Sequence, residues 1–209
     1  MTSTHDHWQT VYQSRDEQQT SWFRPHLEES LRLIEQLALT VDSPVIDIGA
    51  GRSTLVDDLL ARGFADISVL DLSDAALQEA RSRVGETASV RWLAADVLAA
   101  NLPVSHYRLW HDRAVFHFLT WPEDRARYLA QARRSVREGG FVILATFAPD
   151  GPDKCSGLPV CRYDADALAA EFADGFTRIA DSLETHHTPF ATEQNFTYLV
   201  LRRVGQAAD

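Results

Sequence analysis

Cysteine is scarce in this sequence, and no segment is long and apolar enough to cross a membrane. The only two cysteines, Cys155 and Cys161, are too few for the disulfide framework of a secreted protein or for a complete zinc site. No apolar run approaches the roughly 20 residues that a membrane-spanning helix requires. The N-terminus is polar and lacks the basic start and apolar core of a secretory signal. We therefore expect a cytoplasmic protein with reduced thiols and no membrane partner.

Basic residues are also in deficit. The sequence contains 20 lysines and arginines against 30 aspartates and glutamates, which gives a formal net charge of −10. Such a charge repels a phosphate backbone, and the arginines are scattered along the chain instead of forming a patch. The composition therefore argues against a nucleic acid as substrate.

Histidines occur close together at His5 and His7, with Asp6 between them, and again at His186 and His187. Imidazole and carboxylate groups are common metal ligands, so both clusters raise the question of a metal site. We interpret the first cluster as part of a solvated terminus and the second as part of a hairpin loop. No metal site is predicted.

Neither an internal repeat nor a Gly/Ser-rich linker divides the chain. Its 209 residues fit one ordinary domain with a substantial core. We predict a single domain over residues 1–209, with an N-terminal lid or helical segment at 1–40 and a core at 41–209.

Helical and strand patterns alternate along the core. Leucine and isoleucine recur at helical spacing in 26–39, and the short apolar run at 45–49 is typical of a buried strand. The same patterns predict helices over 26–39, 53–63, 74–85 and 122–140 and strands over 45–49, 66–73, 89–96, 106–113 and 141–147. This alternation indicates a doubly wound, mostly parallel α/β sheet with helices on both faces. Ligands of such sheets bind beyond the carboxyl ends of the strands.

The end of the chain departs from this alternation. Two strand-like runs, 176–187 and 195–203, follow each other with no helix between them. This pattern predicts an antiparallel hairpin.

Two glycines, Gly49 and Gly51, follow the first predicted strand in the segment VIDIGAG. At a strand-to-helix turn, missing β-carbons let the backbone bend sharply and approach a ligand closely. Asp71 stands twenty residues after Gly51, at the end of the next predicted strand, where a carboxylate can accept hydrogen bonds from both hydroxyls of a ribose. The arrangement favours a nucleotide-like ligand, although a turn that merely needs glycine produces the same GxG pattern.

The class of nucleotide follows from the rest of this loop. A dinucleotide fingerprint has a third glycine, but the chain continues as Arg52, Ser53 and Thr54, and no GKS or GKT of a P-loop is present. Asp47 precedes the first glycine by two residues, where its charge repels a pyrophosphate and attracts an ammonium group. S-adenosylmethionine has no phosphate and carries an amino group and a sulfonium, so it suits this loop better than NAD does.

Four ordered motifs make the chain similar to the class I, Rossmann-like S-adenosylmethionine-dependent methyltransferases over nearly its whole length. The segment 47–51, DIGAG, resembles the first motif of the family, and 69–73, VLDLS, resembles its ribose-binding motif. AADV at 94–97 resembles the third motif, and WHDRAVFHFLT at 110–120 is similar to the segment that flanks the transferred methyl group. The resemblance implies a seven-stranded sheet that ends in the antiparallel hairpin.

The resemblance also implies the residues that bind the cofactor. In it, Asp71 binds the ribose, Asp96 bonds to the adenine amino group, and Val97 lines the adenine ring. The complete set of predicted cofactor-binding residues is Asp47, Gly49, Ala50, Gly51, Asp71, Leu72, Asp96, Val97, His111, Trp8 and Tyr12.

The N-terminal segment contains aromatic residues separated by polar ones, including Trp8, Tyr12 and Trp22. A similar element forms a lid over cofactor and acceptor in branches of the family that include thiopurine, tellurite and protein-lysine methyltransferases. The resemblance implies that Trp8 and Tyr12 contact the cofactor and that Trp22 contacts the substrate. Ordinary packing of the segment on the sheet is the alternative.

Methyl transfer from a sulfonium is a direct displacement, which mainly requires alignment of the acceptor and exclusion of water. An acid or base is optional, and His111 and Asp112 are the candidates for catalysis in the segment beside the methyl group. The alternative is that His111 is structural and that Asp112 pairs with Arg113. Phe116 is a candidate for the wall of the substrate pocket.

Cys155 lies in a Pro- and Gly-rich segment, 148–164, directly after the fifth predicted strand. The carboxyl edge of the sheet would place this loop beside the pocket. Its thiol is a candidate for recognising a thiol or metalloid acceptor, although a lone loop thiol is usually inert.

These observations predict an S-adenosylmethionine-dependent methyltransferase with a small-molecule acceptor, such as a thiol or a metalloid, because the chain has no room for a large recognition domain. A lysine side chain on a partner protein is the alternative acceptor. A non-catalytic cofactor-binding module and an NAD-dependent oxidoreductase are further alternatives. The intact loop with Asp71 and Asp96 argues against the module, and the missing third glycine argues against the oxidoreductase. No oligomeric state is predicted.

Overall fold

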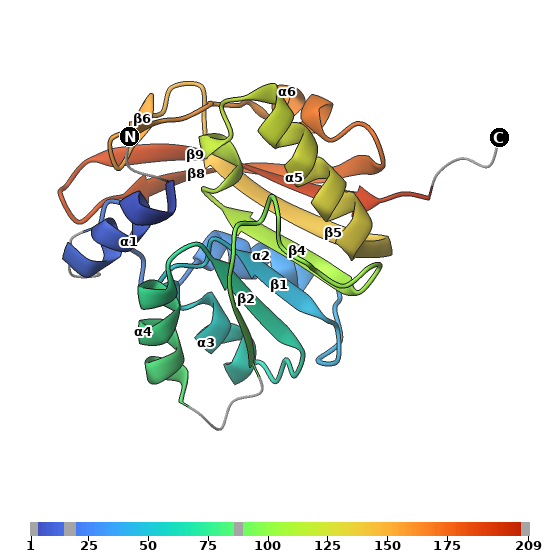
Figure 1. Cartoon of the computed structure of the whole chain (residues 1–209). Coiled ribbons are helices and arrows are strands. Elements are labelled where there is room, and N and C mark those ends of the chain that lie inside the picture. The colour runs from blue at the N-terminus through green and yellow to red at the C-terminus, as the bar shows by residue number, and fades with distance from the viewer. Residues whose placement is uncertain (1–3, 15–19, 86–89, 206–209) are drawn as a thin grey trace.

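The computed structural model describes residues 4–14, 20–85 and 90–205. Its centre is a seven-stranded sheet with the strand order β3-β2-β1-β4-β5-β9-β8 (Figure 1). Five strands are parallel, and β9 runs antiparallel to both of its neighbours. The predicted fold class, a doubly wound and mostly parallel sheet with an antiparallel C-terminal hairpin, is confirmed.

Each of the five parallel strands corresponds to a predicted apolar run. They are β1 (Val45–Ile48), β2 (Ile67–Asp71), β3 (Val90–Ala94), β4 (Tyr107–Arg113) and β5 (Val136–Phe147). Residue 89, the first of the predicted third strand, lies outside the described residues. In the register of the sheet, Asp47 of β1 pairs with His111 of β4. The strand order reverses between β1 and β4, where ligands of such sheets bind.

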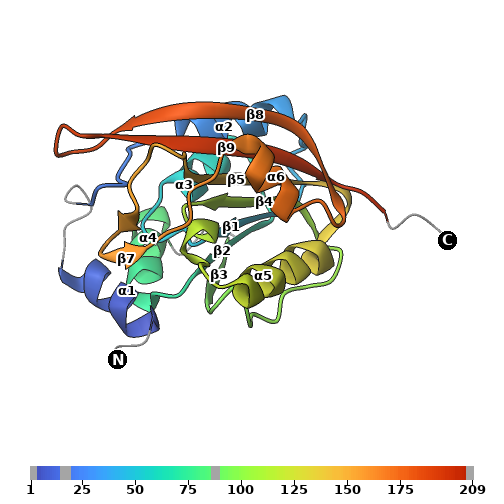
Figure 2. The ribbon, with the colours of Figure 1, turned by 90° about the horizontal axis from the view of Figure 1, so that it is seen from above.

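Helices cover both faces of the sheet, as the view from above shows (Figure 2). The helices that cover the sheet are α2 (Glu28–Gln36), α3 (Leu55–Ala61) and α4 (Asp74–Val84) on one side and α5 (Pro122–Ser135) and α6 (Ala165–Glu171) on the other. Leu31 of α2 and Leu59 of α3 belong to one buried cluster, and Tyr128 of α5 and Leu168 of α6 belong to the second. The sheet between the two clusters is buried on both faces, which explains why its strands read as apolar runs.

The C-terminal hairpin consists of β8 (Phe176–His187) and β9 (Glu193–Arg203). Strand β9 inserts beside β5, so that Phe147 pairs with Phe196, and β8 forms the edge of the sheet. The two predicted strand-like runs therefore form the expected antiparallel pair.

The boundary between α5 and β5 differs from the prediction of a helix to residue 140. Helix α5 ends at Ser135, and Val136 has a strand conformation, with φ −78° and ψ 126°. Val136 is buried and pairs with Tyr107 of β4. The polar residues after Val136 have a propensity for helix, which explains the prediction. Burial and strand pairing of the β-branched Val136 outweigh this propensity.

Several short elements that were not predicted individually lie near the carboxyl ends of the parallel strands. They are α1 (Thr4–Ser14), the 3₁₀ turn η2 (Phe116–Phe118) and the hairpin of β6 (Lys154–Cys155) and β7 (Leu158–Pro159). Figure 2 shows α1 and β7 at the same end of the sheet. Residues 15–19 of the predicted lid lie outside the described residues. These elements therefore surround the edge at which a ligand is expected.

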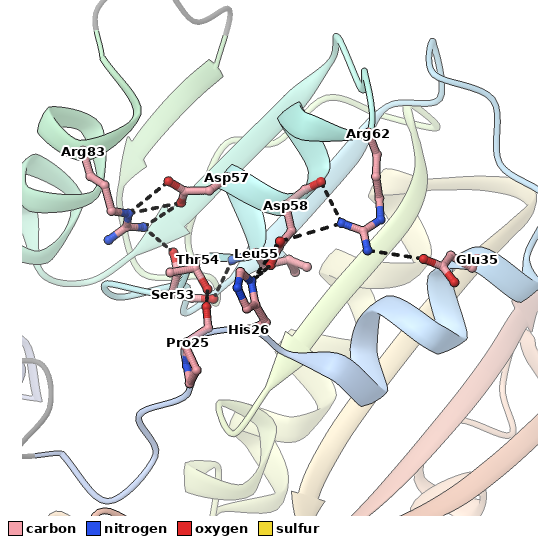
Figure 3. A network of polar contacts seen from close by, with 10 residues as sticks. All are labelled: Pro25, His26, Glu35, Ser53, Thr54, Leu55, Asp57, Asp58, Arg62 and Arg83. Carbon is pink, nitrogen blue, oxygen red and sulfur yellow. Dashed lines mark hydrogen bonds and ion pairs between the residues drawn. The ribbon is translucent and has the colours of Figure 1, made fainter.

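Polar contacts fix helix α3, which follows the glycine loop, to the segments on both sides of it (Figure 3). From α4, Arg83 donates to Asp57 at 2.9 Å and to the carbonyl of Ser53 at 2.7 Å. On the opposite side, the hydroxyl of Thr54 donates to the carbonyl of Pro25 at 2.7 Å. The end of the glycine loop is thereby held between the N-terminal segment and α4.

The described residues contain no group of three or more His, Cys, Asp or Glu side chains placed to hold a metal ion. The sequence analysis placed His186 in a hairpin loop, and this prediction is wrong. His186 is a buried residue of β8. Its Nδ1 accepts from Arg24 Nε at 2.9 Å, and its Nε2 donates to the carbonyl of Ser21 at 2.7 Å. Across these same parts of the chain, the helices all fall short of the length and apolar character of a membrane span.

Candidate active site

A cavity of about 900 Å³ opens at the carboxyl edge of the sheet. The final residues of all five parallel strands line it, namely Ile48, Asp71, Ala94, Arg113 and Phe147. A second cavity of about 60 Å³ shares part of this wall. We call them the large and the small cavity.

The predicted site residues divide between the two cavities. Those that line the large cavity are Trp8, Tyr12, Trp22, Gly49, Asp71, Leu72, Asp96, Val97 and Cys155. Those that line the small cavity are Tyr12, Trp22, Asp47, Gly49, Ala50 and His111. Gly51 lies beneath Tyr12, whereas Asp112 and Phe116 line neither cavity.

The conformation and surroundings of Gly49 and Gly51 both exclude a side chain. Their φ angles are +63° and +53°, in the left-handed region that favours glycine. A β-carbon at Gly49 would overlap the side chain of Val115, and one at Gly51 would lie 2.8 Å from Cζ of Tyr12. The loop therefore needs glycine for more than a turn, because each position also allows a close approach of another group.

Asp71 ends β2 with a buried carboxylate that faces the large cavity. It accepts hydrogen bonds from the backbone N–H groups of Gly51 at 2.8 Å and Ser73 at 2.7 Å. Burial raises the pKa of Asp71 to about 6, and the two N–H donors oppose this rise. Asp71 does not cap α4, because Ser73 accepts from the backbone of Ala76 in that role. Its lone pairs are therefore available at the cavity.

Asp96 and Val97 lie beside Asp71 in the cavity wall. The backbone N–H of Ala95 donates to the carbonyl of Asp71 at 2.9 Å, which brings the end of β3 next to the end of β2. Val97 is buried, and Asp96 is exposed and accepts from the backbone of Leu98 at 2.9 Å. This part of the wall thus offers an apolar surface next to an acceptor of hydrogen bonds.

Asp47 and His111 form a buried pair at the small cavity. His111 Nδ1 lies 2.7 Å from Oδ1 of Asp47, and its Nε2 lies 2.9 Å from the hydroxyl of Ser30 in α2. Oδ2 of Asp47 is buried and has no hydrogen-bond partner among the described residues. An unpartnered buried carboxylate oxygen is costly, and a cationic group in the small cavity would satisfy it.

Asp112 points to the opposite face of β4, so the predicted catalytic role does not fit its position. Its carboxylate accepts from the backbone of Val115 at 2.8 Å and of Phe116 at 3.1 Å, and from the hydroxyl of Tyr128 at 2.5 Å. It is fully buried and does not pair with Arg113, which was the alternative. Asp112 therefore fixes the start of η2 against α5.

We predict that Asp112→Asn will destabilise the fold and leave the cavity chemistry intact. The carboxylate of Asp112 now accepts from two backbone N–H groups and one hydroxyl. In the variant, the amide NH₂ would face some of these donors and leave them unsatisfied, which lowers the free energy of unfolding by about 1–3 kcal/mol. Urea unfolding should show this loss as a lower midpoint. The affinity of the folded variant for S-adenosylhomocysteine should stay unchanged, and a loss of that affinity would contradict the structural role.

Phe116 also differs from its prediction as a pocket wall. It is fully buried beneath α5 and α6, with its ring centroid 5.1 Å from that of Tyr128 and 5.2 Å from that of Phe172. Phe118, two residues later, lines the large cavity instead. The 3₁₀ turn η2 rotates these two side chains to different sides, which the sequence did not reveal.

Aromatic rings form one end of the large cavity, which we call the aromatic compartment. Its rings belong to Trp8, Trp22, Phe118, Phe147 and Phe196. The centroid of Trp8 lies 5.1 Å from Phe118 and 6.0 Å from Trp22, both in edge-to-face geometry. The sequence analysis identified the two tryptophans but not the three phenylalanines. The sequence feature that could have indicated the phenylalanines is their position near the strands of the sheet.

Cys155 contributes a thiol to the wall of the large cavity, near the aromatic compartment. The thiol is buried, and burial raises its pKa to about 12. It is therefore a neutral thiol near pH 7 and not a thiolate.

Helix α1 covers the glycine loop and is tied to α4. Arg52 of the loop donates to the carbonyl of Tyr12 and forms an ion pair with Glu79 of α4 at 2.6 Å. The hydroxyl of Ser73 donates to Gln9 of α1 at 2.8 Å. Figure 1 shows the resulting position of α1 beside α4. The N-terminal helix thus closes part of the large cavity.

Comparison with known proteins identifies relatives of this arrangement. The sequence model of the family described as "Methyltransferase domain" matches residues 45–140, the span from β1 into β5. EEF1A lysine methyltransferase 2 of Homo sapiens is 22% identical over 188 residues, which cover 83% of this chain and 74% of that protein.

Solved structures share the fold over almost the whole chain. One, described as "Conversion of a Disulfide Bond into a Thioacetal Group during Echinomycin Biosynthesis", has a TM-score of 0.77 at 17% identity and covers 99% of this chain and 95% of its own. The N-methyltransferase NodS from Bradyrhizobium japonicum, in complex with S-adenosyl-L-homocysteine, has a TM-score of 0.72 at 14% identity. The match covers 95% of this chain and 99% of NodS. Together with the glycine loop and the acidic residues at the strand ends, these findings show that the chain has the class I, Rossmann-like methyltransferase fold and carries a methyltransferase domain that uses S-adenosylmethionine.

Proposed function

We propose that the enzyme methylates a small molecule bound in the aromatic compartment. The observation that carries this proposal is the aromatic lining of the compartment by Trp8, Trp22, Phe118, Phe147 and Phe196 at the edge of the sheet. Concave, mostly apolar pockets with a few polar groups are typical binding sites for small ligands. A thiol or metalloid acceptor is one subclass of this proposal, with the neutral thiol of Cys155 as its recognition group.

The proposal assigns the rest of the two cavities to the cofactor, which supplies a methyl group on a positively charged sulfur. Asp71 accepts hydrogen bonds from the ribose hydroxyls, and Asp96 and Val97 receive the adenine. Oδ2 of Asp47, which has no partner among the described residues, accepts from the ammonium group of the methionine part. The absence of side chains at Gly49 and Gly51 lets the backbone approach the cofactor. This assignment leaves the aromatic compartment for the methyl acceptor.

In this assignment His111 is a positioning residue. Its ring nitrogens contact Asp47 at 2.7 Å and Ser30 at 2.9 Å, so neither is directed at an acceptor. Donation from Nδ1 to Oδ1 of Asp47 holds the other carboxylate oxygen toward the small cavity. The enzyme therefore contributes mainly alignment and exclusion of water to the displacement.

We also propose that residues 1–40 form an N-terminal lid or helical segment, with α1 as the lid, and that residues 41–209 form the core of the same domain. The support comes from α1, whose Trp8 and Tyr12 line the large cavity while Gln9 contacts α4 through Ser73. A cytoplasmic location belongs to the same proposal, because Cys155 and Cys161 are both free cysteines.

A protein-lysine acceptor is the second candidate function. Its support is the similarity to EEF1A lysine methyltransferase 2, which covers most of both chains. A lysine substrate would have to thread its side chain into the compartment from the surface, whereas a small molecule would be enclosed. A cofactor-binding module without turnover is a further alternative, and it would bind S-adenosylmethionine and never convert it.

A titration followed by a transfer assay tests these functions. Calorimetry should show saturable binding of S-adenosylmethionine and S-adenosylhomocysteine, with NAD as a control that does not bind. Labelled S-adenosylmethionine is then incubated with the enzyme and a cell extract that has been separated by size. Label in the small-molecule fraction supports the proposal, label in protein supports the lysine alternative, and binding without transfer supports the module.

The lid carries its own prediction. Trp8→Ala should weaken the binding of S-adenosylhomocysteine about tenfold, because the variant loses edge-to-face contacts with Trp22 and Phe118. Phe190→Ala removes an exposed aromatic residue that lines neither cavity, so it is the control and should bind normally. Equal affinities of the two variants, measured by calorimetry, would mean that α1 does not close over the cofactor.

A further inference from the structure

The last residue of β4, Arg113, is a buried cation at the junction of the two cavities. Its side chain is only 7% exposed, and it lines both the large and the small cavity. A charged residue at a buried strand end requires compensation, because transfer of an ion from water into a protein interior is costly. The contacts of its guanidinium show how much of this compensation the fold supplies.

Only part of the hydrogen-bonding capacity of Arg113 is used. Nη1 donates to the carbonyl of Trp22 at 3.3 Å. Nε and Nη2 are buried and have no hydrogen-bond partner of good geometry among the described residues, although the hydroxyl of Tyr198 interacts with the guanidinium. Nη2 lies 4.0 Å from Oε2 of Glu184, too far for a hydrogen bond, and that oxygen also has no partner in the described part of the chain. Glu184 instead meets Arg24 at 3.0 Å through its other oxygen.

The titratable neighbours of Arg113 supply no further negative charge. Burial lowers the pKa of His117 to about 3 and that of His186 to about 4, and the charge of Arg113 adds to both shifts. Burial raises the pKa of Cys155 to about 12 and that of Tyr198 to about 12. All four side chains are neutral near pH 7, so Glu184 is the one anion beside Arg113 among the groups named here.

The unused donors of Arg113 lie on one edge of the guanidinium. Nε–H and one N–H of Nη2 point in parallel, and this fork matches the two oxygens of a carboxylate. The plane of the group packs over the ring of Phe196, with 4.5 Å between its central carbon and the ring centroid. Arg113 therefore carries an incompletely used, two-pronged pair of donors beside Glu184 and next to the apolar wall of the aromatic compartment.

We infer that the methyl acceptor is a small carboxylic acid with an apolar body, and that Arg113 binds its carboxylate. The inference rests on the proposed function because it names the acceptor class of the same compartment. The apolar body would pack among the rings of Trp8, Phe118 and Phe147. The methionine carboxylate of the cofactor is the competing ligand for Arg113, but Arg24 and Arg52 also line the small cavity and can serve that group.

Binding to the enzyme saturated with S-adenosylhomocysteine tests this inference. The probes are benzoate and 3-phenylpropionate, each compared with its neutral amide, by calorimetry. The acids should bind at least about tenfold more tightly than the amides, and Arg113→Gln should remove this preference while changing the affinity for S-adenosylhomocysteine less than about twofold. Glu184→Gln should tighten the binding of the acids, since it removes a competing negative charge at 4.0 Å.

Arg108→Gln is the matched control. Arg108 lies at the other end of β4 and also packs over a phenylalanine, with 4.7 Å to the ring centroid of Phe141, but it lines neither cavity. This variant should bind acids like the unchanged enzyme. The Glu184 variant keeps the test valid if Arg113→Gln does not fold.

Three outcomes would overturn the inference, and they differ from one another. If acids and amides bound with equal affinity, the compartment would still be a small-molecule site, but the charge of Arg113 would have no role in binding the acceptor. A loss of S-adenosylhomocysteine affinity in Arg113→Gln as large as the loss of acid binding would assign Arg113 to the cofactor. Failure of every probe to bind, together with labelled protein in the transfer assay, would instead contradict the proposed function itself.

Discussion

Asp71→Ala is expected to weaken the binding of S-adenosylhomocysteine at least about a hundredfold, because two hydrogen bonds to a charged carboxylate are lost together. The carboxylate is buried at the wall of the large cavity, and it also accepts from the N–H groups of Gly51 and Ser73. Its removal therefore loosens the loop that the cofactor must approach. Calorimetric titration of the folded variant measures the effect.

The same residue predicts a pH dependence. Burial raises the pKa of Asp71 to about 6, so the free enzyme carries the ionised form mainly above that pH. Ribose hydroxyls donate to the carboxylate and stabilise the ionised form. The affinity for S-adenosylhomocysteine should therefore be constant above about pH 7 and fall as the pH drops through 6. In Asp71→Asn this dependence should be absent.

Asp112→Asn is a matched control for both measurements. Burial also raises the pKa of Asp112 to about 6, but its carboxylate lies on the far side of β4 and lines neither cavity. The control should keep the affinity and the pH profile of the unchanged protein. If Asp71→Ala bound as tightly as this control, the assignment of Asp71 to the ribose would be wrong.

Gly51→Ala is expected to release α1 and to reduce the affinity for S-adenosylhomocysteine at least about tenfold. The new β-carbon would overlap the hydroxyl of Tyr12 and approach Cζ at 2.8 Å. The aromatic ring is rigid and belongs to α1, so the helix must move outward. Limited proteolysis should then cut the N-terminal segment faster, and calorimetry should show the loss of affinity.

The variant Gly85→Ala is the control that distinguishes the effect of the contact with Tyr12 on affinity from the effect of backbone strain. Gly85 also has a positive φ, +89°, but a β-carbon there would meet no atom of the described residues within 4 Å. Both variants place a β-carbon at a positive φ and carry a backbone strain of about 1–3 kcal/mol in the folded state. Only Gly51→Ala should lose affinity, and a similar loss in both variants would show that strain alone is responsible.

The fold could be predicted for those strands whose apolar sequence reflects burial of both faces of the sheet. Most of the parallel strands and β9 are apolar runs of strand length, whereas β8 is a more polar run at the edge of the sheet, and the structure contains all of them at the expected places. The boundary after α5 could not be predicted, because Val136 is fixed by pairing with Tyr107, more than twenty residues earlier in the chain. Such pairing depends on tertiary contacts that local patterns do not contain.

The site could be predicted where the chain geometry is simple. Residues at the ends of neighbouring parallel strands meet, so Asp71 and Asp96 come to lie in one cavity wall. His111 and Asp112 were both candidates for catalysis, yet neighbouring residues of a strand point to opposite faces, so both cannot face the cavity. His111 therefore faces Asp47, and Asp112 faces Tyr128.

Arg113 was considered only as a partner of Asp112, although the pattern contained a stronger signal. A charged residue at the end of a strand that is otherwise buried needs a reason. By the same alternation, Arg113 lies on the face of His111 and not on that of Asp112. What the sequence could not provide is the set of neighbours, Trp22, Glu184 and Phe196, which come from distant segments.

The docking of α1 has a kinetic consequence. The wall that would hold the nucleoside lies beneath this helix of 11 residues, which Gln9 and the carbonyl of Tyr12 connect to the body of the enzyme. If α1 is the lid that we propose, release of the spent cofactor would require this short helix to detach, a motion that often limits turnover in enzymes with lids. Contacts that tighten binding would then slow each catalytic cycle, so the few hydrogen bonds that hold α1 would become an adjustable determinant of speed.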